Sequence, residues 1–218
     1  MYVMNMTTEE MAREYRADLL ELNANNNRID NSEYVSKLIN KHKKAGRFCF
    51  VRFSKTSRNN RYVNVYQYVK TKSTQQAVRW DWTVKSMALM QTRKGVAVIA
   101  FFADASIAIV FQQHFFNRYK ERLLEVCDWK TRNELMNATT AEKVIAVWAK
   151  RNPNIIWMNT KSKFKEKEHI FAPIEDGVVL MQCDGERIQA NTFITKGMCS
   201  EKQLAMVEQA EQAKRQDT

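Results

Sequence analysis

The run Tyr62-Val63-Asn64-Val65-Tyr66-Gln67-Tyr68-Val69 interleaves tyrosine and valine with asparagine and glutamine. A short run rich in β-branched and aromatic residues is typical of a β-strand, because such side chains pack well on a pleated surface. Comparable runs lie before and after it, separated by short polar breaks. We therefore expect strands at Arg47–Phe53, Tyr62–Val69, Ala77–Met90, Val96–Phe102 and Ile107–Phe111. Strands so close together in the chain predict a largely antiparallel sheet.

Helical patterns flank this β-rich stretch on both sides. Thr7 and Glu10 form a capping-box pair, and apolar residues then recur at helical spacing as far as Leu22. The asparagine-rich run Asn23–Asn31 is expected to end this first helix. The predicted helices lie at 8–22, 32–44, 112–126, 131–136, 141–149 and 200–214.

A hairpin is predicted near the C-terminus. Asp184-Gly185 separates the runs Gly177–Cys183 and Arg187–Thr195, and this dipeptide readily adopts a tight turn. Together these elements predict an α+β fold with a mostly antiparallel sheet, N-terminal helices, a central helical segment and a C-terminal helix. The segments 1–46, 47–111 and 112–218 are expected to form either one domain or closely fused ones.

The charge balance points to an acidic partner. The chain has 218 residues and a formal net charge of +11, from 35 Lys and Arg against 24 Asp and Glu. Such an excess repels itself in the folded protein, so it is usually retained for a partner. The apolar runs are too short for a membrane span. The dispersed cysteines and isolated histidines predict no disulfide framework, no metal site and no cofactor, and we expect a cytoplasmic protein.

Between Tyr34 and Trp80 the sequence contains no Asp or Glu. Cations and aromatic rings alternate through this stretch, which suits a phosphate chain whose bases stack on flat rings. The predicted nucleic-acid-binding residues are Lys41, Lys43, Lys44, Arg47, Arg52, Lys55, Arg58, Arg61, Tyr66, Lys70, Lys72, Arg79 and Trp80. A solvated basic face over a buried aromatic core would produce the same pattern. The missing acids favour nucleic acid.

The predicted helix that begins at Gln112 has two chemically different faces. One face is aromatic and aliphatic, and the neighbouring side carries His114, Arg118, Glu121 and Arg122. An imidazole can transfer a proton near neutral pH, and guanidinium groups can bind phosphate and stabilise developing negative charge. This is the minimum equipment for cleaving RNA without a metal. Ordinary surface salt bridges would give the same pattern.

The pattern His-x-x-x-Arg-x-x-Glu-Arg on a helix, followed by strands of which the last contains Thr, resembles the barnase, EndoU, colicin and RelE group of small metal-independent ribonucleases and toxins. The corresponding strands here are Gly177–Leu180 and Thr192–Thr195. The resemblance covers residues from about 105 to about 200, and the β-rich stretch before the helix departs from the compact family domain.

This resemblance implies a role for each matching residue. His114 would serve as acid or base, and Arg118 and Arg122 would bind phosphate. Thr192 or Thr195 would supply a polar group from the facing strand.

These observations predict a nucleic-acid-directed protein, with RNA favoured over DNA, that acts as a metal-independent endoribonuclease of toxin or mobile-element type. Two alternatives stay open. One is a non-catalytic nucleic-acid-binding accessory or phage-encoded protein. The other is a protein-interaction module or inhibitor whose basic face meets an acidic protein, such as an antitoxin.

Overall fold

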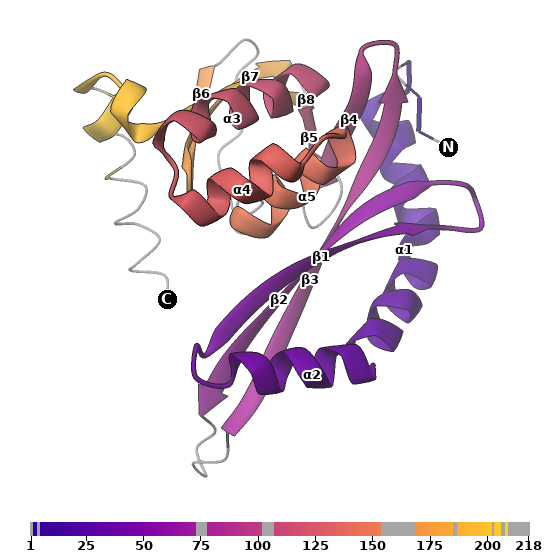
Figure 1. Ribbon diagram of the computed structural model, residues 1–218. Helices are drawn as coiled ribbons and strands as arrows, with labels where there is room; N and C mark the ends of the chain where they lie inside the picture. Colours follow the sequence, from indigo (N-terminus) through magenta and orange to yellow (C-terminus); the bar gives the residue numbers. More distant parts are fainter. Residues whose placement is uncertain are drawn as a thin grey trace.

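The computed structural model describes residues 2–3, 5–72, 78–101, 107–153, 169–184, 187–201, 203–205 and 208. Within them the chain forms the predicted α+β fold, with eight strands in one sheet (Figure 1). The strands are β1 (Arg47–Lys55), β2 (Arg61–Lys72), β3 (Val78–Thr92), β4 (Gly95–Phe101), β5 (Ala108–Phe111), β6 (His169–Ile174), β7 (Gly177–Asp184) and β8 (Arg187–Ile194). The helices are α1 (Thr8–Asp30), α2 (Glu33–His42), α3 (Gln113–Val126), α4 (Trp129–Asn137), α5 (Ala141–Arg151) and the short 3₁₀ helix η1 (Lys196–Met198).

The strand order of the sheet is β1-β2-β3-β4-β5-β8-β7-β6. Every neighbouring pair is antiparallel except β5 and β8, which run parallel. β1 and β6 are therefore the edge strands. Because β4 pairs with β3 only from Ala88 onward, the first half of β3 also has no strand on its far side among the described residues.

Helices cover both faces of the sheet. α1 and α2 pack on one face through residues such as Met11, Leu22 and Val35. α3, α4 and α5 pack on the other face, where Phe111, Phe115 and Trp148 lie in the largest apolar core. Successive side chains of a strand point to opposite faces, so a strand that is covered by helices on both faces carries apolar residues on both.

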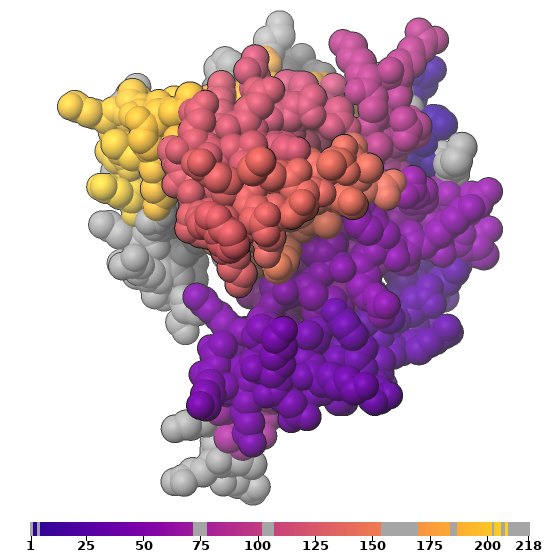
Figure 2. Space-filling model, viewed as in Figure 1, coloured from indigo at the N-terminus to yellow at the C-terminus, as the bar shows by residue number. Residues whose placement is uncertain are grey.

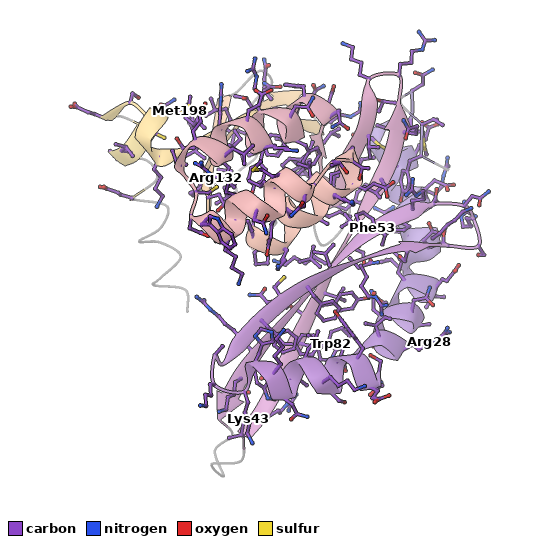
Figure 3. All side chains as sticks on the ribbon, in the orientation of Figure 1. Arg28, Lys43, Phe53, Trp82, Arg132 and Met198 are labelled. Atoms are coloured by element: carbon purple, nitrogen blue, oxygen red, sulfur yellow. The ribbon has the colours of Figure 1, made fainter. Side chains whose placement is uncertain are left out.

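One end of the molecule is a three-stranded extension, which we call the arm: β1, β2, the first half of β3, and the α1–α2 layer that packs on them. In Figure 1 the arm projects below the red and orange helices α3–α5. Its inner face is aromatic. Phe48 stacks on Tyr68 with ring centroids 4.7 Å apart, and Phe50 stacks on Tyr66 at the same distance. Trp82, labelled in Figure 3, lies between the strands and α2.

α1 is longer than its sequence predicts. We expected Asn23–Asn31 to end it, but the helix continues to Asp30. The side chains of Asn26 and Asp30 accept hydrogen bonds from the hydroxyls of Tyr66 (2.7 Å) and Tyr68 (2.6 Å) on β2. These tertiary contacts stabilise a helix whose local sequence is unfavourable.

Two other differences concern the C-terminal half. β6 was not predicted, because its residues include Pro173 and a short apolar run without clear alternation. It takes the edge position where proline is tolerated. The predicted C-terminal helix begins at Ser200, whose hydroxyl accepts from the amide of Gln203 (3.4 Å), and its described residues 201, 203–205 and 208 are helical. Its remainder lies outside the described residues.

None of the helices formed by the described residues combines the length and the apolar character needed to cross a lipid bilayer.

Candidate nucleic-acid interface

Most of the predicted cations lie at the two ends of the arm's strands. One end, which we call the arm end, consists of residues 41–47, 70–71 and 78–80. The other is the β1–β2 turn with its flanking residues, 55–61. The two ends differ in how far acids from elsewhere in the chain neutralise them.

At the arm end, five cations have no acidic partner among the described residues. Lys41, Lys43, Lys44 and Arg47 are exposed on the last turn of α2 and the connection to β1, and Lys70 is half-buried on β2. None of the five forms an ion pair with a described carboxylate. Figure 3 shows Lys43 at this extremity of the molecule.

Local backbone geometry brings these cations together. Gly46 has φ +71°, which lets the chain turn sharply from α2 into β1. The amide of Lys70 donates to the carbonyl oxygen of Gly46 (2.7 Å), so β2 ends beside the turn. Cations in the last turn of α2 also offset the negative end of its helix dipole. One short connection therefore gathers positive charge from α2, β1 and β2.

Three other predicted residues lie near this end. Arg79 is exposed and pairs with Asp81 (Nε to Oδ1, 2.7 Å), a surface contact that leaves most of the guanidinium accessible. Trp80 is half-buried and packs against Phe48 with ring centroids 5.6 Å apart. The side chain of Lys72 lies outside the part of the chain that the structure describes.

At the β1–β2 turn, acids from distant helices neutralise the predicted cations. Arg58 contacts Glu14 (2.5 Å) and Asp18 (3.6 Å) of α1, and Arg61 contacts Glu142 of α5 (2.5 Å). Lys55 is exposed. Two of the three cations at this turn therefore already pair with carboxylates of the protein. Because these charges are neutralised, their assignment to nucleic acid is weaker.

The aromatic rings of the acid-free stretch are mostly not available for base stacking. Tyr66 is 2% exposed and Tyr68 is 1% exposed. Tyr66 was predicted to bind nucleic acid, and this is wrong because its ring lies under α1 and its hydroxyl bonds Asn26. Arg52 lies on the same face and covers the ring of Tyr34 at 5.4 Å from its centroid, a cation–π contact.

The sequence contains a signal for the contacts between α1 and the arm's strands, which were not predicted. Polar residues recur on α1 at multiples of four, and residues four apart are neighbours on a helix surface, so they form a row along the helix. This polar stripe is Glu14, Asp18, Asn26 and Asp30. Asp18 is 1% exposed and accepts from Tyr62 (2.7 Å) and Asn60 (2.7 Å), while burial raises the pKa of Tyr62. The stripe thus supplies the carboxylates that the strands lack.

Four of the six residues proposed for catalysis lie on α3, at a distance from the arm end in Figure 1. His114 is exposed in the first helical turn. Arg118 is exposed and pairs with Glu121 (Nη1 to Oε2, 3.1 Å). Such an i,i+3 pair on the surface contributes little to stability and leaves both groups accessible.

Arg122 is brought against the predicted facing strand. Its Nη1 donates to the hydroxyl of Thr192 (3.2 Å) and to the carbonyl oxygen of Phe193. These bonds lie where β8 continues past Ala190, the last residue that pairs with β5. The guanidinium therefore binds the main chain of β8 as well as the predicted threonine.

Thr195 and His114 make no contact with Arg122 or Thr192 among the bonds of the described residues. Thr195 is buried, and its carbonyl oxygen accepts from the amide of Met198 (3.0 Å) at the start of η1. His114 precedes Arg122 by eight residues, which is about 12 Å along the helix axis. A substrate touching both would have to lie along α3.

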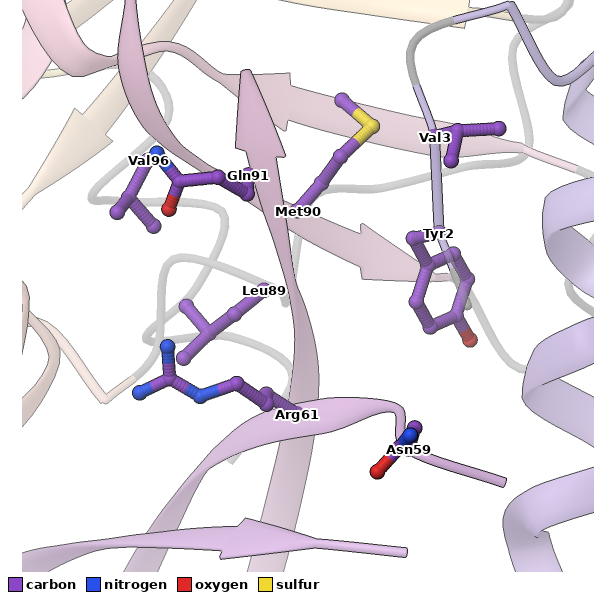
Figure 4. A pocket seen from close by; sticks show the side chains of 8 residues that line it. All are labelled: Tyr2, Val3, Asn59, Arg61, Leu89, Met90, Gln91 and Val96. Atoms are coloured by element: carbon purple, nitrogen blue, oxygen red, sulfur yellow. The ribbon is translucent and has the colours of Figure 1, made fainter.

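Two cavities lined by described residues differ in size and lining. The smaller, about 120 Å³, lies between the N-terminal segment and β3 (Figure 4). Tyr2, Leu89 and Met90 line it, and its one charged lining residue, Arg61, already pairs with Glu142. The larger, about 500 Å³, is a groove between β1 and the α4–α5 pair. Among the described residues, no cluster of three or more His, Cys, Asp or Glu is arranged to hold a metal ion.

Comparison with protein-family models, curated proteins and solved structures found no match to this chain. The resemblance of the α3 pattern to metal-independent ribonucleases therefore stays a prediction.

Proposed function

We propose that this protein binds nucleic acid, with RNA preferred to DNA, through the cations of the arm end. The observation that supports this is the local charge imbalance. Lys41, Lys43, Lys44, Arg47 and Lys70 lie on one turn between α2, β1 and β2, and no described carboxylate pairs with them. Arg79 adds a guanidinium that is 76% exposed.

The chemistry of this surface favours the phosphate backbone over the bases. Lysine and arginine contacts to phosphate position the chain without reading its sequence. The rings that would stack on bases are largely buried under α1 and α2, with Trp80 only half-exposed. Binding should therefore depend strongly on salt and weakly on sequence.

The test is a pair of charge-matched variants. Lys43→Ala/Lys44→Ala removes two arm-end cations, and Arg93→Ala/Lys94→Ala removes two exposed cations at the β3–β4 turn, at the opposite end of β3. Affinity for a fluorescent single-stranded RNA is measured by anisotropy from 50 to 300 mM KCl, with a DNA of the same sequence alongside. We expect the arm-end variant alone to reduce the slope of log affinity against log salt, by about 1.4 for two lost phosphate contacts.

Equal losses in both variants would show that net charge, and not the arm end, determines affinity. Failure of the wild-type protein to bind RNA or DNA at 50 mM KCl would also contradict the proposal. Preference for DNA would contradict only the choice of RNA.

The second candidate is metal-independent RNA cleavage at α3. It is supported by the contact of Arg122 with Thr192 (3.2 Å), two residues to which the resemblance gives roles, and by the exposure of His114 and Arg118 on the same helix. His114 would transfer the proton and the arginines would bind the phosphate.

Cleavage is tested by incubating labelled RNA with the protein in excess EDTA. We expect His114→Ala to lose activity, while His42→Ala, which changes a histidine stacked on Phe48 of β1, keeps it. No cleavage by the wild-type protein, or equal cleavage by wild type and His114→Ala, removes this candidate and leaves a non-catalytic binder.

A cytoplasmic location belongs to the same proposal. The four cysteines are free thiols, and reducing conditions would keep them so.

A further inference from the structure

β1 has an open main-chain edge. It pairs with β2 on one side and with no described strand on the other. The amide of Thr56 donates to the carbonyl oxygen of Asn60 (2.9 Å), and the amide of Lys70 donates to that of Gly46 (2.7 Å). In an antiparallel pair, hydrogen-bonded positions alternate with outward-facing ones. The even-numbered residues of β1 therefore bond β2, and the main-chain groups of the odd-numbered residues 47–55 face outward.

A groove runs beside this edge. Its volume is about 500 Å³, and its walls are Val51 of β1, Asn133 and Asn137 of α4, and Ala146 and Val147 of α5. In Figure 2 the surface is indented on the left between the red helices and the purple arm. An extended chain has the right shape for such a groove, because one side meets main-chain donors and acceptors and the other meets a mixed apolar and amide wall.

The side chains along the edge show which kind of chain would fit. Phe53 is 39% exposed and lies where β1 passes the helices (Figure 3). On the opposite face, Arg52 is held over the ring of Tyr34 (5.4 Å). Lys143 adds positive charge in the lining of the groove, and Lys55 adds an exposed cation at the end of β1.

The acids at this edge are few. Among the residues that line the groove, Glu134 is the one acid, and it pairs with Lys150 (3.2 Å). The free charge along the edge is therefore positive.

We propose that the open edge of β1 binds an extended acidic peptide segment of a partner protein as a ninth strand. Residues of that segment beside Val51 and Phe53 would be apolar, and the alternate residues, beside Arg52, would be acidic. Lysine and arginine on an edge strand also protect it from self-association, so a basic edge of this kind selects an acidic strand and disfavours a second copy of itself.

The probe is a fluorescent eight-residue peptide that alternates Glu and Val. Its control is a peptide of the same composition with four Glu followed by four Val. Affinity is measured by anisotropy, and the site is located by amide hydrogen exchange followed by NMR. We expect the alternating peptide to bind more tightly and to slow exchange at the outward amides of Val51 and Phe53.

Two pairs of variants identify the contacts. Phe53→Pro removes an outward amide without removing a bond to β2, and its control Phe53→Thr keeps that amide. We expect about tenfold weaker binding for the proline variant alone. Arg52→Glu should weaken binding about threefold to tenfold, while Lys94→Glu at the β3–β4 turn leaves it unchanged. Circular dichroism melts confirm that each variant folds, and Arg52→Glu gives an independent answer if the proline variant does not.

Four results would overturn the proposal. They are equal binding of the two peptides, equal binding to wild type and Arg52→Glu, protection of the β1 amides by a single-stranded oligonucleotide instead of the peptide, and sedimentation of the wild-type protein as a dimer that Arg52→Glu dissociates. The last two would assign the edge to nucleic acid and to a second copy of this chain, respectively. RNA binding by the arm end is measured separately, with Lys43→Ala/Lys44→Ala, so neither proposal depends on the other.

Discussion

Asp176, between β6 and β7, bonds side chains from two other elements and the residue that follows α5. Its carboxylate accepts from the hydroxyl of Tyr119 on α3 (2.5 Å), from Nη2 of Arg151 on α5 (2.5 Å) and from the side-chain amide of Asn152 (3.0 Å). The side chain is 4% exposed. Burial and the adjacent carboxylate hold the pKa of Tyr119 well above its ordinary value. This network joins the helical layer to the C-terminal strands.

Asp176→Ala should be strongly destabilising. It leaves Arg151 with an uncompensated, partly buried charge and two hydrogen-bond donors without their acceptor, a loss of about 3 to 5 kcal/mol. Glu121→Ala removes an acid from an exposed pair and should cost about 0.5 kcal/mol or less. Urea denaturation of both variants measures the difference. A loss below about 1 kcal/mol for Asp176→Ala would contradict this assignment.

Side-chain hydrogen bonds connect α1 to β2. Asp18, Asn26 and Asp30 lie on the polar stripe of α1, and each accepts a hydrogen bond from a tyrosine of β2. The side-chain amide of Asn26 also donates one hydrogen bond to the hydroxyl of Ser86 on β3 (3.4 Å). Asp18, Asn26 and the three tyrosines are buried and Asp30 is half-buried. A missing bond at a buried position would leave a polar group unsatisfied.

This contact predicts an alkaline limit to stability. Burial raises the pKa of Tyr62 and Tyr68 above the ordinary value of 10.0. In the unfolded chain these groups lose their protons from about pH 10, while in the folded protein they keep them. Their contribution is therefore fully present below pH 10 and is lost as pH rises further, by about 1.4 kcal/mol per pH unit for each tyrosine.

Urea unfolding between pH 8 and pH 11 measures this slope. Tyr68→Phe removes one of the titrating groups, so its slope should be shallower than that of the wild-type protein even though its stability at pH 8 is lower. A stability that stays constant up to pH 11, or an identical slope in Tyr68→Phe, would show that these hydroxyls ionise freely in the folded state.

Local pattern predicted most of these elements. The strands from Arg47 to Phe111 and the hairpin after Gly177 occur close to their predicted positions, because alternation and turn residues are local signals. The last two turns of α1 and strand β6 were missed. Their conformation depends on partners far away in the chain, which local propensity does not contain.

The whole molecule separates its charge in a way that sequence order conceals. Most cations of the acid-free stretch lie at the two ends of the arm's antiparallel strands. At the β1–β2 turn, Glu14 of α1 pairs with Arg58 and Glu142 of α5 pairs with Arg61. At the arm end, Asp81 is the one described acid that pairs with a cation, and its partner is Arg79. The sequence therefore predicted the arm-end cations as a candidate site. It could not predict which cations the helices neutralise, because that depends on how α1 lies across the sheet.

The measurement that tests nucleic-acid binding by the arm end most directly is an NMR titration of the isotopically labelled protein with a short single-stranded RNA at low salt. We expect the largest amide shifts at residues 41–47, 70–71 and 78–80, and small shifts at 55–61, where the cations are already paired. The largest shifts at 55–61 or along the first turn of α3, with none at 41–47, would contradict the assignment of the arm end as the nucleic-acid interface.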